Sequence, residues 1–88
     1  MLVAEIRTST LFEKQYRKLP KKIKELAKQK EISFRKNPFH PSLETHKLHG
    51  KDKGAWAFSI NRKYRIKFLF VEDGNVLFLE AGLHDIYQ

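Results

Sequence analysis

The fold of this chain is decided by the stretch AWAFSINRKYRIKFLFVEDGNVLFLEA, residues 55–81. Apolar side chains alternate with others in two runs, which are Trp56, Phe58 and Ile60, then Tyr64, Ile66, Phe68 and Phe70. This period of two predicts strands with one buried face. Asn61–Lys63 and Glu72–Asn75 interrupt the runs, and the Asp73-Gly74 pair favours the positive φ angles of a tight turn. Because such short turns join antiparallel neighbours, we predict a three-stranded meander that ends with a strand over 76–81.

The residues before the meander predict one strand and two helices. Leu2–Arg7 alternates with a period of two and predicts a short strand. Thr10 and Glu13 fit a capping box, with Thr10 as the N-cap of a first helix. Pro20 interrupts the helical pattern and can begin a second helix, which the Asn37-Pro38 pair ends.

We therefore predict an α+β fold in a single domain over residues 1–88. It consists of an N-terminal strand, a basic helical hairpin and the three-stranded antiparallel meander, with the helices packed on one face of a four-stranded sheet. Residues 39–54 have no clear period and predict a loop that can include a strand or a short helix.

The charge of the chain points to a polyanionic partner. The net charge is +8, and residues 9–37 contribute +7 of it, from 10 basic and 3 acidic residues. A basic helical hairpin suits nucleic acid or an acidic protein, although a solvated lysine-rich face is the plainer interpretation. The chain has no cysteine, which excludes disulfides and thiolate metal sites. It has neither a long apolar run nor a secretory signal pattern, so we expect no membrane contact and a cytoplasmic location.

The residues suited to chemistry are one arginine and two histidines. Arg65 alternates with the apolar side of its strand, so it is predicted to lie with Lys67 on the face away from the helices, where ordinary polar-out alternation is the alternative. His46 precedes the meander and His84 follows it, and imidazole titrates near neutral pH. The entry and exit of a short meander can approach each other, so His46, Arg65, His84 and Tyr87 could converge. The spacing His46-x-x-His49 supplies only two metal ligands, and we predict no metal site.

Four local signatures, in this order, resemble the RelE/ParE superfamily of bacterial toxins. They are Thr8-Ser9-Thr10-Leu11-Phe12, Leu48-His49-Gly50, Trp56 through Arg65-Ile66, and Gly82-Leu83-His84-Asp85-Ile86-Tyr87. The resemblance covers essentially the whole chain. It is greatest to the ribosome-dependent mRNA endonucleases of the YafQ-like branch, which share the histidine before Leu-x-Gly and the terminal Gly-x-His. The intermediate histidine and the acidic–aromatic pair of that branch have no match near residues 57–64.

The resemblance implies a toxin that cleaves mRNA on the ribosome without a metal or a small-molecule cofactor. It assigns catalytic roles to His46, Arg65, His84 and Tyr87. One histidine would take the proton of the ribose 2′-OH, Arg65 would bind the phosphate, and the other histidine would protonate the leaving oxygen. The side chains expected to hold RNA are Lys47, His49, Lys51, Lys53, Arg62 and Lys63.

The resemblance also implies partners and leaves alternatives open. The partners are the ribosome, mRNA and an acidic, partly disordered antitoxin, which would block the site or displace the C-terminal segment. A ParE-like gyrase poison without catalysis is the first alternative, because fold and charge do not separate it from a nuclease. A noncatalytic module that binds RNA or the ribosome is the second.

Overall fold

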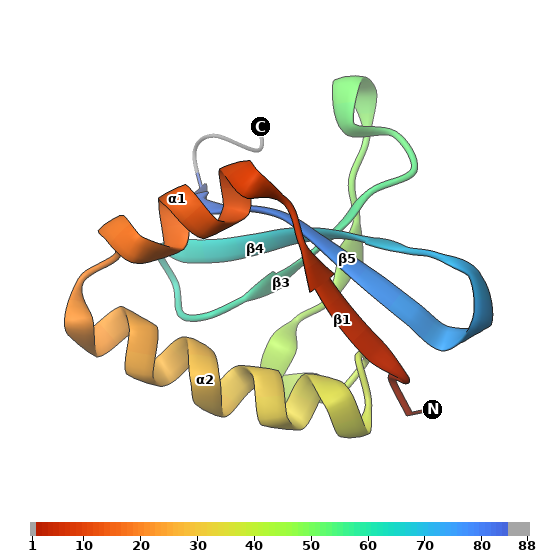
Figure 1. Ribbon diagram of the computed structural model, residues 1–88, viewed down its shortest axis with the longest axis horizontal. Helices are drawn as coiled ribbons and strands as arrows, with labels where there is room; N and C mark the ends of the chain where they lie inside the picture. The colour runs from red at the N-terminus through yellow and green to blue at the C-terminus, as the bar shows by residue number, and fades with distance from the viewer. Residues whose placement is uncertain (1, 85–88) are drawn as a thin grey trace.

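The computed structural model describes residues 2–84, which form two helices and a five-stranded sheet. The helices are α1 (Thr10–Lys18) and α2 (Lys21–Lys36), and the strands are β1 (Glu5–Thr8), β2 (His46–Lys47), β3 (Trp56–Ser59), β4 (Tyr64–Phe70) and β5 (Asn75–Leu83). The strand order is β1-β5-β4-β3-β2, with β1 parallel to β5 and every other neighbouring pair antiparallel. Both helices cover the same face of the sheet (Figure 1), which confirms the predicted α+β fold.

The meander is confirmed, and the sheet has one strand more than predicted. Asp73 and Gly74 form the β4–β5 turn with φ angles of 60° and 76°, as their sequence indicated. The additional strand, β2, pairs with β3 and is only two residues long, so no periodic pattern could mark it. The first strand begins at Glu5 instead of Leu2, because the N–H groups of Val3 and Ala4 bond elsewhere, to the carbonyls of Arg35 and Gly74.

The start of α1 corrects the predicted capping box. Ser9, not Thr10, is the N-cap, and its hydroxyl accepts a hydrogen bond from the Phe12 N–H at 2.9 Å. Glu13 instead accepts a hydrogen bond from the Thr8 hydroxyl at 2.6 Å. Ser9 is favoured because its N–H also donates to the Phe78 carbonyl, while its hydroxyl donates to the Leu79 carbonyl. Contacts with β5 therefore decide where the helix begins, and a local sequence motif cannot predict them.

The main core lies between the helices and the sheet. Phe34 of α2 is fully buried and contacts three phenylalanine rings of the sheet, with centroid distances of 4.8 Å to Phe58, 5.0 Å to Phe68 and 5.6 Å to Phe78. Edge-on and offset ring pairs of this kind add to the stabilisation that burial provides. One aromatic side chain of α2 thus holds the helix against three strands.

A β-bulge in β5 decides which side chains reach the opposite face. Phe68 pairs with Phe78, whereas the preceding residue, Lys67, pairs with Glu80, so Leu79 is an extra residue. An extra residue reverses the alternation of the strand. Before the bulge Val76 and Phe78 are in the helix-side core, and after it Ala81 is. Glu80 and Gly82 consequently lie on the face away from the helices.

Candidate functional site

The site is centred on Arg65, in a row of three residues across the sheet. Arg65 of β4 pairs with Ser59 of β3 on one side and with Gly82 of β5 on the other. Paired residues point to the same face, and this face is opposite the one that carries Ile66 and Phe68 into the core. Gly82 has no side chain, so its strand presents only backbone beside the guanidinium.

The Arg65 guanidinium is held by neutral groups. Its Nη1 donates to the Ser59 hydroxyl at 2.7 Å and to the Asn61 carbonyl at 3.2 Å. Its Nε is buried and has no hydrogen-bond partner within the described residues. No carboxylate of residues 2–84 forms an ion pair with it. A buried donor left without a partner costs about 1–3 kcal/mol, and the cost is removed when an anion accepts the bond.

His84 lies where β5 leaves the sheet, close to the β3–β4 turn. Its backbone N–H donates a hydrogen bond to the Lys63 carbonyl at 2.7 Å, which connects the end of β5 to that turn. The ring Nδ1 is buried and, among residues 2–84, finds no hydrogen-bond partner. His84 lines a shallow hollow of about 260 Å³ with Arg62, Lys63 and Leu83. A titratable ring and two exposed cations therefore surround one small cavity.

Lys67, two residues from Arg65 on the same face, has a different environment. Its ammonium forms ion pairs with Asp52 at 2.6 Å and Glu80 at 2.7 Å. Burial lowers the pKa of Lys67, but the hydrogen bonds and charges of Asp52 and Glu80 outweigh burial, and the pKa is raised. Lys67 thus lies on the predicted face, but its charge is not available to a ligand there, because carboxylates of Asp52 and Glu80 pair with it.

The loop of residues 48–55 covers part of the sheet face that lies away from the helices. Leu48, Ala55 and Ala57 form a second, smaller apolar cluster, against which Leu69 packs. Asp52 adds its ion pair with Lys67 at the same place. The loop is thus fixed to the sheet beside Arg65.

The other predicted catalytic residues lie farther from Arg65. His46 is exposed in β2, and its Nδ1 lies 3.0 Å from the Glu44 carbonyl oxygen. His46 pairs with Ala57, which pairs with Lys67, so its Cα lies two strands across and two residues along from Arg65, about 12 Å at standard sheet spacing. Tyr87 lies outside the described residues.

The six predicted RNA-binding residues are exposed, and five of them form two groups. Arg62 and Lys63 are in the β3–β4 turn, beside His84. His49, Lys51 and Lys53 are in the 48–55 loop. Lys47 directly follows His46 in β2 and so points to the opposite face. The structure therefore gathers cations at both ends of the Arg65 face but leaves Lys47 off it.

Two contacts of the site escaped sequence reasoning. Ser59 is buried beneath Arg65, and Asp52 meets Lys67 across 15 residues of sequence. The only available signal for Ser59 was its position in the same alternation as Ala57. Nothing in the sequence marks the Asp52 contact.

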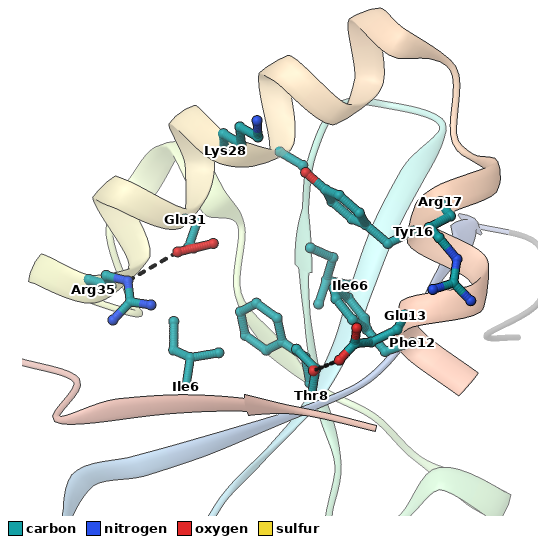
Figure 2. Close-up of a pocket in the computed structure, with 12 residues that line it drawn as sticks. Ile6, Thr8, Phe12, Glu13, Tyr16, Arg17, Lys28, Glu31, Arg35 and Ile66 are labelled. Atoms are coloured by element: carbon teal, nitrogen blue, oxygen red, sulfur yellow. Dashed lines mark hydrogen bonds and ion pairs between the residues drawn. The ribbon is translucent and has the colours of Figure 1, made fainter. Parts of the chain in front are cut away.

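A larger hollow lies on the other side of the sheet, between the helical hairpin and β1 (Figure 2). We call it the hairpin groove. It measures about 420 Å³, and its lining residues are Ile6, Thr8, Phe12, Glu13, Tyr16, Arg17, Ala27, Lys28, Glu31, Arg35, Ile66 and Phe78. Its floor is apolar and its rim is charged. The Thr8–Glu13 and Glu31–Arg35 contacts close two parts of the rim, whereas Arg17 and Lys28 have no ion-pair partner within residues 2–84.

The described residues contain no group of three or more potential metal ligands. None of the helices within residues 2–84 has the length and hydropathy needed to cross a membrane.

Comparison with solved structures identifies the fold. A YoeB/ParE toxin from Agrobacterium tumefaciens matches with a TM-score of 0.77 and 14% identity, over 91% of this chain and 98% of that one. YafQ from E. coli matches with a TM-score of 0.72 and 19% identity, over 92% and 93%. The archaeal RelE–RelB complex from Pyrococcus horikoshii gives 0.74 and 16%, over 94% and 96%. No protein-family model and no curated protein matches. The predicted resemblance to RelE/ParE toxins is thus confirmed in the fold.

Proposed function

We propose that this protein is the toxin of a toxin–antitoxin pair and that it cleaves mRNA on the ribosome. The observation that carries the proposal is the environment of Arg65, a half-buried cation whose hydrogen-bond partners among residues 2–84 are all neutral. Nearby, His84 lines the hollow at the β3–β4 turn, and its Nδ1 has no hydrogen-bond partner among residues 2–84. A phosphate of RNA supplies the charge and the acceptors that these groups lack. The fold shared with YoeB, YafQ and RelE supports the same function.

The cleavage step is a transfer of the phosphate from one oxygen to another. A base takes the proton of the ribose 2′-OH, the 2′-oxygen bonds to phosphorus, and the bond from phosphorus to the 5′-oxygen breaks. A general acid returns a proton to the departing 5′-oxygen. The products are a 2′,3′-cyclic phosphate and a 5′-hydroxyl, so the reaction consumes no water and selects RNA over DNA.

Each side chain has a role in this step. Arg65 binds the phosphate oxygens and stabilises the charge that develops on them. His84 is one proton-transfer group, because it lies at the same end of the sheet as Arg65. His46 is the second, reached by RNA that lies across β3 and β4, and Tyr87 contacts a base or the phosphate. The exposed cations of the turn and the loop hold the RNA backbone on either side.

The direct experiment measures cleavage of a ribosome-bound mRNA by the parent protein, Arg65→Ala and His84→Ala. His40→Ala is the matched control, because His40 is exposed and, among residues 2–84, the side-chain hydrogen bonds of His40 are made with Ser42. We expect both site variants to lose cleavage, the control to retain it, and a single 2′-deoxy substitution at the cut to block it. Translation that continues while DNA damage accumulates would instead indicate a gyrase poison.

The antitoxin is proposed to bind the hairpin groove. A helix with an apolar stripe and flanking carboxylates fits the apolar floor, and its carboxylates would pair with Arg17 and Lys28. The charge-reversing pair Arg17→Glu and Lys28→Glu should weaken binding of the acidic antitoxin by more than tenfold. Reversal of Lys18 and Lys22, which lie on the hairpin but do not line the groove, is the control. Equal effects of the two pairs would mean that bulk charge, not the groove, binds the partner.

A further inference from the structure

We infer that Ser59 is a positioning residue, which orients the Arg65 guanidinium toward the phosphate while leaving its charge unneutralised. The inference rests on the proposed function for its catalytic consequence, and on the contacts of Arg65 for its geometry. Ser59 is 3% exposed and is the buried polar residue of the described part of the chain. Its hydroxyl meets Arg65 Nη1 at 2.7 Å.

The sheet register explains why a serine at this position can hold Arg65. Ser59 and Arg65 are directly paired on β3 and β4, and such residues have Cβ atoms about 4.5–5.5 Å apart. An arginine side chain is much longer than this separation, so it must fold back for its Nη1 to reach Ser59. A small side chain whose acceptor, Oγ, is bonded directly to Cβ leaves room for that conformation.

The turn after Ser59 supplies the second acceptor. The Asn61 side-chain oxygen accepts hydrogen bonds from the N–H groups of Lys63 at 2.9 Å and Tyr64 at 2.8 Å. These bonds fix the turn, and the Asn61 carbonyl then accepts from Arg65 Nη1 at 3.2 Å. Two acceptors on one nitrogen set the plane of the guanidinium. The Nε–H is buried and unpartnered within residues 2–84, so the Nη2 group, which is neither buried nor hydrogen-bonded among these residues, is left to meet an anion.

The contrast with Lys67 shows why neutral acceptors matter. Both cations are on β4 and on the same face, yet Lys67 pairs with two carboxylates whereas Arg65 meets a hydroxyl and a carbonyl. A carboxylate at position 59 would hold Arg65 as firmly but would cancel the charge that attracts phosphate. Lys67 therefore fixes the 48–55 loop to the sheet, whereas the charge of Arg65 remains available for a ligand.

Three substitutions of Ser59 separate its role as a hydrogen-bond acceptor from its lack of charge. Ser59→Ala removes the acceptor, Ser59→Thr keeps it, and Ser59→Asp keeps it but adds a negative charge. Ser42→Ala is the control, because Ser42 is exposed in the short 3-10 helix Pro41–Leu43. Misplacement of a catalytic group costs up to about 100-fold, so we expect Ser59→Ala to lower kcat roughly 10- to 100-fold with little change in KM. Ser59→Thr should restore kcat, and Ser59→Asp should instead weaken binding of an uncleavable 2′-deoxy RNA oligonucleotide.

A double-mutant cycle and an NMR measurement complete the test. If Ser59 acts through Arg65, Ser59→Ala causes no further loss of the residual kcat that remains in an Arg65→Ala background. Additive losses would overturn the inference. The Arg65 Nε–H resonance reports the geometry directly, and it should shift and exchange faster with solvent in Ser59→Ala but not in Ser42→Ala. An unchanged resonance overturns the positioning role. If the resonance changes in Ser59→Ala but the parent protein cleaves no RNA, the positioning role is supported and the proposed function is refuted.

Discussion

The Lys67→Met substitution tests the ion-pair cluster that fixes the 48–55 loop to the sheet. Met has nearly the length of Lys but no charge, so the change leaves Asp52 and Glu80 without their shared cation. Both carboxylates contact the Lys67 ammonium, at 2.6 and 2.7 Å, and the Lys67 side chain is only 12% exposed. We expect the substitution to destabilise the whole domain and to loosen the loop.

The size of the effect follows from the burial of the three side chains. Exposed ion pairs contribute about 0–1 kcal/mol, and breaking a buried pair by removing one partner costs about 3–5 kcal/mol. The two carboxylates are 25% and 27% exposed, which places the cluster between these limits. We therefore expect a loss of about 2–3 kcal/mol in the free energy of unfolding. In a domain of this size that loss lowers Tm by roughly 10–20 °C.

The assay is urea unfolding at neutral pH, with Arg35→Met as the matched control. Arg35 pairs with Glu31 one helical turn away, and its side chain is 47% exposed, so the control should lose less than about 0.5 kcal/mol. Hydrogen exchange of the 48–55 amides should accelerate in Lys67→Met alone. Equal losses in the two variants, or unchanged exchange in the loop, would refute the reasoning.

The same cluster has a predicted pH dependence. The folded protein raises the pKa of Lys67 above its usual value of 10.5, because Asp52 and Glu80 outweigh the opposing effect of burial. The stabilisation is complete below pH 10.5, where Lys67 is protonated in both states, and it is lost as the pH rises through the folded pKa. The stability difference between the parent and Lys67→Met should therefore shrink above pH 10.5.

Three other predictions test separate parts of the molecule. Ser9→Ala should cost about 1–2 kcal/mol in urea unfolding, whereas Thr10→Ala should be nearly neutral; the reverse order would restore the capping box with Thr10 as N-cap. The joint change of Arg62 and Lys63 to Gln should reduce the slope of log affinity for single-stranded RNA against log salt by up to about 1.4, and an unchanged slope would mean that neither contacts phosphate. Burial raises the pKa of Tyr16, so absorbance titration should show its phenol ionising above pH 10.0 in the folded protein and near 10.0 after unfolding.

Local patterns predicted the elements, and contacts remote in sequence decided the details. The alternation around Ile66 and Phe68 was sufficient to predict β4 and its buried face, because a period of two is a local property. The β-bulge at Leu79 is different, since it is defined by pairing with β4 and by the contact of the Leu79 carbonyl with Ser9. Simple alternation after Phe78 would have placed Gly82 on the helix side, away from Arg65.

The candidate site divides in the same way. Arg65 was predictable because its neighbours on β4 mark the face on which it lies. The neutralisation of Lys67 was not, because Asp52 comes from a loop without a period and Glu80 reaches the face only after the bulge. The burial of Ser59 also depends on the register between β3 and β4. That register cannot be predicted from the sequence of either strand by itself.

The central claim is that Arg65 and His84 make this small basic domain an mRNA endonuclease. Primer-extension mapping of mRNA cuts, with and without ribosomes, tests it most directly for the parent and His84→Ala. We predict cuts in the parent lane that require ribosomes and are absent for a His84→Ala protein of unchanged stability. The same cuts at the parental rate from folded His84→Ala, or none from the parent, would contradict the account.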